Sequence, residues 1–285
     1  MPKGQRVYGL VPLSKYFVAT PKPPKQQEAN WMDAAPHRQK RDVIYNTYSV
    51  LEKDPMYAGP SLEDAMILVR PLFLTAWLLR EAVLSIPLEQ LLITSASSKT
   101  GASLAALMKK RRDETGLRIK IIGMTSPSNV SYCNSLGYYD EVIPYSPTYP
   151  MEKLVIVDMA GKLDLLRGIQ ANLKDSLVKI ISVGMTHVEE VDMGATFSGE
   201  GFNPKYAKPE FFFAPKYAGK VLKADPLALT QAVPRDWHDF IQNYPLNIQR
   251  CTSAAQVASV LNDFASGKIP GDVSWVGSWN SASAL

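Results

Sequence analysis

Residues 90–101, QLLITSASSKTG, decide how the rest of the chain is interpreted. The stretch begins with an apolar run that favours a buried strand, continues with small hydroxyl residues, and leads into an amphipathic helix. Such a turn directs backbone N–H groups and the positive end of a helix toward one point, where a phosphate can bind. Glycines usually occupy three positions of this turn, and here they read Ser95, Ser98 and Gly101. Because two glycines are replaced, the motif alone is weak, and the segments after it strengthen the interpretation.

Further strand-like segments come after this turn and are separated by helical spans. They are residues 118–125, 141–143, 154–157 and 178–183. Strands that alternate with helices predict an α/β fold with a parallel, doubly wound sheet. In such sheets ligands bind beyond the carboxyl ends of the strands, where the strand order reverses. We therefore expect the residues that end these strands to converge on one crevice.

The composition excludes several classes of function. With 46% hydrophobic and 20% charged residues, the chain is ordinary for a globular protein. Its net charge of +4 is spread along the chain, apart from the basic run at residues 109–112. Asp113 and Glu114 come directly after that run, which favours a solvated helix end over a nucleic-acid surface. We expect no nucleic-acid partner.

The cysteines and the apolar runs bear on the compartment. Cys133 and Cys251 have no metal-type spacing, and no apolar run approaches the ~20 residues of a membrane span. No secretory signal opens the chain. We therefore expect a cytoplasmic protein without a membrane partner.

Polar and aromatic residues gather in residues 34–54. His37, Arg41, Tyr45 and Tyr48 lie there, and Arg41 and Tyr45 share a face if the segment is helical. One interpretation is a surface segment with solvated charges. The other is a wall of a substrate pocket, in which an arginine binds an anionic group and a tyrosine or histidine donates a proton.

Arg70 stands directly before Pro71, inside an apolar helical segment that we expect over residues 61–84. An arginine in such surroundings is either paired structurally or directed into a cleft. Both alternatives stay open at this point, and the second would make Arg70 a substrate anchor.

The order of landmarks resembles the medium-chain dehydrogenase/reductase superfamily, in its zinc-free quinone or enoyl reductase branch. More narrowly, it resembles the uncharacterised DUF2855 family. The motifs that carry the resemblance are GQRVYG (4–9), PHR (36–38), YNTY (45–48), TAW (75–77), SASSKTG (95–101), LGYYD (136–140), DMAG (158–161) and VGMTH (183–187).

This resemblance implies a Rossmann-type doubly wound sheet with a truncated GroES-like β domain at the N-terminus. We expect residues 1–75 to form the partial GroES-like domain on the substrate side, and residues 76–225 to form the dinucleotide-binding domain. Residues 226–285 would return to the substrate-side domain. The front of the GroES-like domain and the family's zinc-ligand pattern are both missing, so we expect no metal site.

The end of the second strand bears on the cofactor. A carboxylate there normally binds the ribose of NAD. The position reads Met124-Thr125-Ser126 and offers hydroxyl donors instead, with Asn129 nearby, so NADP(H) is preferred over NAD(H). Alternatively, the crevice binds no dinucleotide. The residues that we expect at the cofactor are Ser95, Ser97, Ser98, Lys99, Thr100, Gly101, Thr125, Ser126, Asn129, Asp158, Gly184, Thr186 and His187.

The residues and the resemblance together indicate two functions. The first is an NADP(H)-dependent oxidoreductase that acts on a carbonyl or activated double bond of a small organic molecule. The second is a binding or regulatory protein without catalysis, on a degenerate dehydrogenase fold. The apolar segment 211–213, which we expect near a sheet edge, suggests a two-fold homodimer in either case. The expected catalytic residues are Tyr45, Tyr48, His37, Arg41 and Arg70.

Overall fold

The protein is described from a computed structural model. The residues that it describes are 3–12, 14, 16–22, 30–41, 43–146, 148, 152–183, 199–225 and 227–277.

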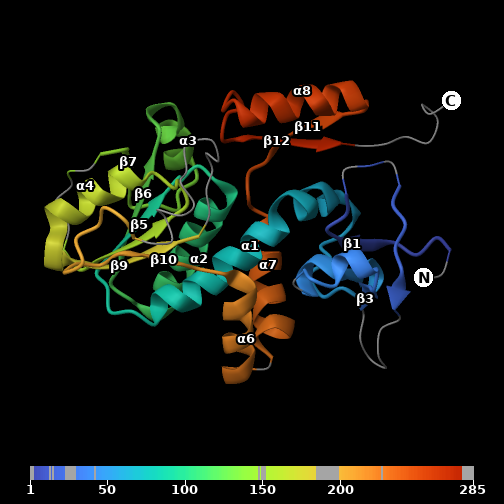
Figure 1. Cartoon of the computed structure of the whole chain (residues 1–285), viewed down its shortest axis with the longest axis horizontal. Helices are drawn as coiled ribbons and strands as arrows, with labels where there is room; N and C mark the ends of the chain where they lie inside the picture. Colours follow the sequence, from blue (N-terminus) through green and yellow to red (C-terminus); the bar gives the residue numbers. More distant parts are fainter. Residues whose placement is uncertain are drawn as a thin grey trace.

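A six-stranded parallel sheet forms the larger layer of the molecule (Figure 1). Its order is β10-β9-β8-β5-β6-β7, so the strand order reverses beside β5. This confirms the predicted doubly wound sheet. All five residues of β8 are buried, as expected for a strand covered on both faces. The strands are β5 (Gln90–Thr94), β6 (Lys120–Thr125), β7 (Glu141–Pro144), β8 (Leu154–Asp158), β9 (Leu177–Ser182) and β10 (Pro209–Phe211).

Helix α1 crosses the middle of the molecule and separates this sheet from the N-terminal part (Figure 1). It continues through Pro71, and the predicted boundary at residue 75 falls inside it. The α-helices are α1 (Glu63–Leu84), α2 (Lys99–Thr115), α3 (Val130–Ser135), α4 (Leu163–Leu173), α6 (Ala214–Ala224), α7 (Val233–Ile241) and α8 (Ala254–Ala265). Short 3-10 segments are Pro36–Arg38, Val43–Asn46, Leu51–Lys53, Pro60–Leu62, Pro127–Asn129 and Lys174–Ser176, and Ala228–Ala232 is a π-helical turn.

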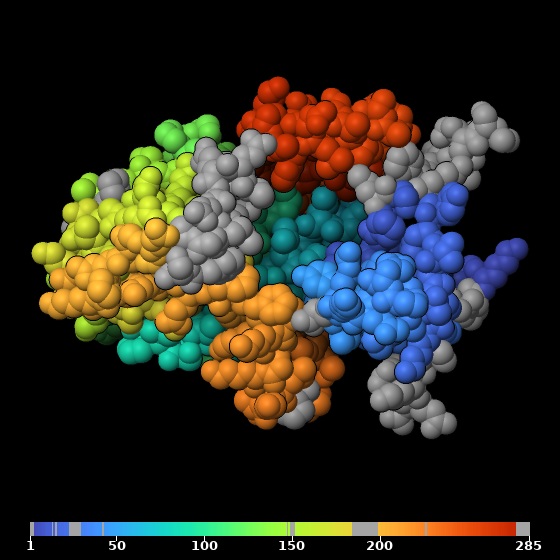
Figure 2. All heavy atoms as spheres, in the orientation of Figure 1, coloured from blue at the N-terminus to red at the C-terminus, as the bar shows by residue number. Residues whose placement is uncertain are grey.

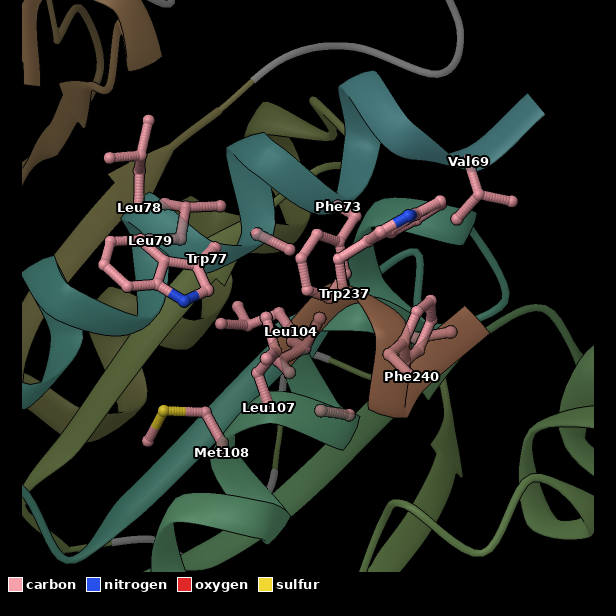
Figure 3. Close-up of a cluster of buried hydrophobic side chains, with 14 of the residues drawn as sticks. Val69, Phe73, Trp77, Leu78, Leu79, Leu104, Leu107, Met108, Trp237 and Phe240 are labelled. Carbon is pink, nitrogen blue, oxygen red and sulfur yellow. The ribbon is translucent and has the colours of Figure 1, made fainter. Parts of the chain in front are cut away.

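The main core lies where α1, α2 and α7 meet (Figure 3). Phe73 of α1 is fully buried, and its ring centroid lies 5.2 Å from those of both Trp237 and Phe240 on α7. Leu104 and Leu107 of α2 fill the other side. This core fixes α2, and therefore the turn before it, relative to α1.

A smaller antiparallel sheet forms the N-terminal part, as the sequence predicts. Its order is β1-β4-β3-β2. A side chain at Gly9 would lie 2.5 Å from the ring of Tyr48, so glycine permits β1 to approach β4 closely. The strands are β1 (Val7–Gly9), β2 (Pro21–Lys22), β3 (Asn30–Asp33) and β4 (Thr47–Val50).

The chain ends, within the described residues, in a β-α-β segment that we call the C-terminal unit, residues 247–277. It consists of β11 (Asn247–Cys251), α8 and β12 (Val273–Gly277), and its two strands pair in parallel as a sheet of their own. An ion pair between Arg250 and Asp64 joins the unit to the start of α1. Figure 1 shows it above α1, between α3 and the N-terminal sheet.

Candidate functional site

The turn between β5 and α2, which we call the serine turn (residues 95–98), lies at the carboxyl edge where the strand order reverses. Ser95 has a φ of 51°, in the left-handed region that normally favours glycine. The Ser98 amide donates to the Ser95 carbonyl at 2.8 Å and closes the turn. The serine turn therefore keeps a conformation typical of a glycine loop at the cost of local strain.

Ser98 and Gly101 fix how α2 begins. The Ser98 hydroxyl accepts a hydrogen bond from the Gly101 amide at 3.1 Å and caps the helix. A Cβ at Gly101 would lie 3.0 Å from the Ser95 carbonyl oxygen, so the helix needs glycine to approach the turn. This is the packing role of the third glycine in dinucleotide-binding turns. Thr100, beside it, is partly exposed.

Lys99, at the first position of α2, is a partly buried cation. Burial lowers the pKa of its ammonium, and the carboxylate of Asp272 acts in the opposite direction. Within the described ranges, no carboxylate lies within ion-pair distance of Lys99. The fold thus holds a positive charge at the helix start without neutralising it.

Hydroxyl groups at the end of β6 meet the serine turn. The Thr125 hydroxyl donates to that of Ser97 at 3.3 Å, and both residues are buried. The Asn129 amide donates to the Ser126 hydroxyl at 3.0 Å. The structure therefore brings these four predicted residues together, and residues 124–129 at this strand end include no carboxylate.

Asp158, at the end of β8, is 1% exposed and is already well supplied with donors. Its carboxylate accepts hydrogen bonds from the Thr94 hydroxyl at 2.6 Å and from the amides of Ala160 and Gly161 at 3.3 and 3.2 Å. Burial raises the pKa of Asp158, and the Thr94 hydrogen bond opposes this. These contacts order the turn after β8, so Asp158 stabilises the backbone beside the serine turn.

Two residues beside the turn were missed at the sequence level. Tyr145, after β7, interacts with Ser95, and burial raises its pKa to about 12 although hydrogen bonds to Ser95 oppose the rise. The ammonium of Lys162, after β8, lies 4.8 Å from the centroid of the Tyr145 ring. Both stand just beyond strand ends, so the rule that selected Thr125 and Asp158 could have found them.

A third feature that the sequence did not indicate is a contact between the C-terminal unit and the serine turn. A Cβ at Gly271, before β12, would lie 3.0 Å from the Ser97 Cβ, 3.3 Å from the Ser97 hydroxyl and 3.4 Å from the Asn129 amide oxygen. The backbone at Gly271 therefore packs directly on the serine turn. Nothing in the local sequence of residues 266–272 signals this long-range contact.

The candidates for catalysis lie on the N-terminal sheet and its connections, not at the serine turn. His37 and Arg41 are exposed, and Tyr45 is 38% exposed. Tyr48 is 2% exposed, packs on Phe17, and its hydroxyl has no hydrogen-bond partner among the described residues. Across the part of the chain that the structure describes, no hydrogen bond or ion pair links these candidates to the serine turn.

Arg70 is held by a buried carboxylate. Its guanidinium donates to both oxygens of Asp54, at 2.6 and 3.1 Å, and lies 4.3 Å from the centroid of the Tyr8 ring. Both partners of the pair are under 10% exposed. This geometry favours the structural alternative for Arg70 over an anchor directed into a cleft.

Three predicted residues, Gly184, Thr186 and His187, fall outside the described residues. In the described part of the chain, no cluster of three or more histidine, cysteine, aspartate or glutamate side chains could hold a metal ion. Its helices also include none with the length and apolar character needed to cross a membrane.

Comparisons with known proteins identify a family and several similar folds. A family model described as "Protein of unknown function (DUF2855)" matches residues 1–269. No curated protein matches the chain. Among solved structures, the chain is similar to the CurK enoyl reductase, with a TM-score of 0.49, 15% identity, and coverage of 73% of this chain and 60% of that one.

Two further solved structures are similar at the same low level. A quinone oxidoreductase from Coxiella burnetii has a TM-score of 0.46 and 14% identity, over 83% of this chain and 62% of that one. CurA in complex with NADPH from Vibrio vulnificus has a TM-score of 0.49 and 13% identity, over 89% and 74%. The chain thus spans about 60% of the length of the first two structures.

Proposed function

The chain belongs to the DUF2855 family, and from that premise we propose that it is a zinc-independent, NADP(H)-dependent oxidoreductase. The substrate class that we propose is a small organic molecule with a carbonyl or an activated double bond. The proposal concerns the crevice at the serine turn.

The observation that carries the proposal is the position of the Lys99 ammonium. A partly buried ammonium at a helix start, at the point where the strand order reverses, attracts an anion through its own charge and through the helix dipole. Burial disfavours the charge, and a bound phosphate would compensate for that cost. A diphosphate is the anion that binds at this place in doubly wound sheets.

The residues around Lys99 fit a phosphorylated nucleotide. Ser95 holds the left-handed conformation of a glycine loop, and Gly101 allows α2 to approach it. At the end of β6, Thr125, Ser126 and Asn129 offer donors and no negative charge, so a 2′-phosphate would meet no repulsion there. This favours NADP(H) over NAD(H).

When bound, the nicotinamide supplies the hydride, and the chain supplies binding, orientation and a proton donor. Lys99 and the serine turn would bind the phosphates, while Asp158 keeps the neighbouring turn in place. On the substrate side, the proposed proton donors and anchors are Tyr45, Tyr48, His37 and Arg41. The buried ion pair with Asp54 argues against such a role for Arg70.

The experiment is a titration with NADPH, monitored by melting temperature and by the fluorescence of the five tryptophans. At a ligand concentration of one hundred times Kd we expect about 2.7 kcal/mol of stabilisation, or an increase of roughly 5 °C in melting temperature. Lys99→Ala should weaken NADPH binding about tenfold or more.

Lys109→Ala is the matched control, because Lys109 lies on the same helix and pairs with Asp113 at the surface. NADH should bind more weakly than NADPH. The absence of any shift at millimolar NADPH would eliminate the oxidoreductase.

The alternative is a binding or regulatory protein without a cofactor. The contact of Gly271 with the serine turn favours it, because this contact occupies space beside Ser97. The same titration separates the two functions: the alternative predicts that NADPH changes neither melting temperature nor fluorescence.

A homodimer is a further part of the proposal. β10 is an edge strand, and Phe211 at its end and Phe213 after it are 52% and 38% exposed. Two-fold pairing at this edge would cover both rings. Light scattering during size-exclusion chromatography should give twice the mass of the 31.5 kDa chain, and a single-chain mass would contradict the dimer.

A further inference from the structure

The link between α8 and β12, residues 266–272, lies on the serine turn. Gly267 has a φ of 66° and ends α8, and the Val273 amide donates to the Pro270 carbonyl at 3.1 Å. These contacts place Gly271 where a Cβ would lie 3.0 Å from that of Ser97. An ordered backbone segment therefore covers one wall of the crevice that the proposed function assigns to the diphosphate.

The same link carries a negative charge toward the Lys99 ammonium. Asp272 lies close enough to Lys99 and to Tyr132 for its carboxylate to act on both groups. Nevertheless Asp272 and Lys99 form no ion pair within the described ranges, so the attraction acts across a gap. A carboxylate that lies near the ammonium without pairing with it compensates the positive charge less well than a bound phosphate would.

The buried residues of the C-terminal unit that carries this link lie on its strands, at Cys251, Ser274 and Val276, and its helix lies at the surface. Helix α8 has no buried residue, and Leu261 and Phe264 are 53% and 70% exposed. The ion pair that joins the unit to α1, between Arg250 and Asp64, lies at the protein surface, where Arg250 is 55% exposed. Figure 2 shows the unit in red as a separate lobe over part of α1 in teal. Such an attachment permits rigid-body movement at a small energetic cost.

We propose that residues 266–272 form a movable cover of the serine turn, and that Asp272 competes with the nucleotide's diphosphate for Lys99. The inference rests on the proposed function, since it concerns the same crevice. Nucleotide and cover exclude each other: binding requires the C-terminal unit to move away from Ser97. By linkage, whatever holds the unit closed weakens nucleotide binding by the same factor.

A reversible crosslink tests the movement. In the double variant Ser97→Cys/Gly271→Cys the two Cβ atoms start 3.0 Å apart, so a shift of a few tenths of an ångström reaches the ~3.5–4.5 Å of a disulfide. Because the Cys133 thiol contacts Thr125, which itself contacts Ser97, the double variant is made in a Cys133→Ser background; Cys251 is 2% exposed and lies on β11. We expect the oxidised form to bind NADPH and inorganic pyrophosphate at least about tenfold more weakly than the same protein after reduction. Equal binding in both forms would overturn the cover.

Asp272→Asn tests the competition without a change of backbone. We expect this variant to bind inorganic pyrophosphate about threefold to tenfold more tightly, and we expect the gain to vanish in a Lys99→Ala background. Asp263→Asn is the matched control, because Asp263 lies on α8 of the same unit and pairs with Lys268 at the protein surface. Unchanged or weaker binding by Asp272→Asn would overturn the competition.

The outcomes separate this inference from the proposed function. Wild-type binding of NADPH, with no effect of the crosslink and of Asp272→Asn, leaves the oxidoreductase standing and removes the cover. Conversely, tighter pyrophosphate binding by Asp272→Asn, with no binding of NADPH to any variant, leaves the cover and removes the dinucleotide. If NADPH binds to no variant and Asp272→Asn does not bind pyrophosphate more tightly, both the oxidoreductase and the cover are excluded.

Discussion

Asp236 on α7 and Lys99 on α2 are both charged side chains shielded from water, and the regions around them are built differently. Asp236 is 2% exposed and accepts hydrogen bonds from Trp77, Arg80 and Lys110, at 2.9, 2.8 and 3.1 Å. Among the described residues, the charge that acts on Lys99 is the carboxylate of Asp272, from beyond ion-pair distance. The carboxylate of Asp236 is thus saturated with hydrogen-bond donors, whereas the ammonium of Lys99 is not saturated with partners among the described residues.

The pKa of each group is lowered, with opposite meanings. Burial alone would raise the pKa of Asp236, but hydrogen bonds from Arg80 and Trp77 outweigh it and lower the pKa to about 2. The fold therefore favours the charged form of Asp236. For Lys99 burial lowers the pKa, so the fold disfavours its charged form. A saturated charge indicates a structural centre, and an unsaturated one indicates a place for a ligand.

The largest effect should come from breaking the saturated region. Asp236→Asn removes the buried negative charge that Arg80 and Lys110 share between α1, α2 and α7, and leaves them with the more exposed carboxylates of Glu81 and Asp239. We expect the free energy of unfolding to fall by about 3 to 5 kcal/mol, measured by urea denaturation. The matched control is Asp239→Asn, which loses one contact to Lys110 from a carboxylate that is 61% exposed and should cost less than about 1 kcal/mol. Equal losses in both variants would show that the buried network is no structural centre.

The stability of the protein in acid should also depend on Asp236, with a smaller effect than that of the Asp236→Asn substitution. The folded-state pKa of Asp236 lies below its unfolded value of ~3.9, so its contribution is complete above that pH and is lost as the pH falls toward 2. Between pH 5 and pH 2, the wild type should lose roughly 2 kcal/mol more stability than Asp236→Asn. Parallel pH profiles of the two proteins would contradict this assignment.

The sheet could be predicted from the sequence because each of its strands is a short apolar run between helical spans. The predicted strand at residues 154–157 is β8, and the one at 178–183 is β9, each within one residue. Among the elements that were not predicted are β2, β3, β4, α6 and β11. The polar pattern of β11, with exposed Asn247, Gln249 and Arg250, contains no strand signal, since it pairs with β12 in a two-stranded sheet at the surface.

The site was predictable only in part. Serine, lysine and threonine could be placed at strand ends from local spacing, and the structure brings Ser97 and Thr125 together there. The contact of Gly271 with Ser97 joins positions far apart in the chain, and no local pattern encodes it. For Arg70, the sequence left pairing or a cleft open, and only the structure supplies the partner Asp54.

The smallest effect on stability should come from Lys99→Met, and it is the sharpest test of the unsaturated region. Methionine keeps the length of the side chain and removes the charge. Because the folded-state pKa of Lys99 is lowered, its charged form carries a cost at pH 7 that is relieved only as the pH rises through that pKa.

The free energy of unfolding of Lys99→Met should therefore stay unchanged or rise by less than about 1 kcal/mol in urea denaturation without ligand. Inorganic pyrophosphate should then stabilise the wild type and not the variant, because it neutralises a charge that the variant lacks. A variant clearly less stable than the wild type would place Lys99 with Asp236 among the structural charges, and the contrast between the two regions would no longer mark the crevice as a binding site.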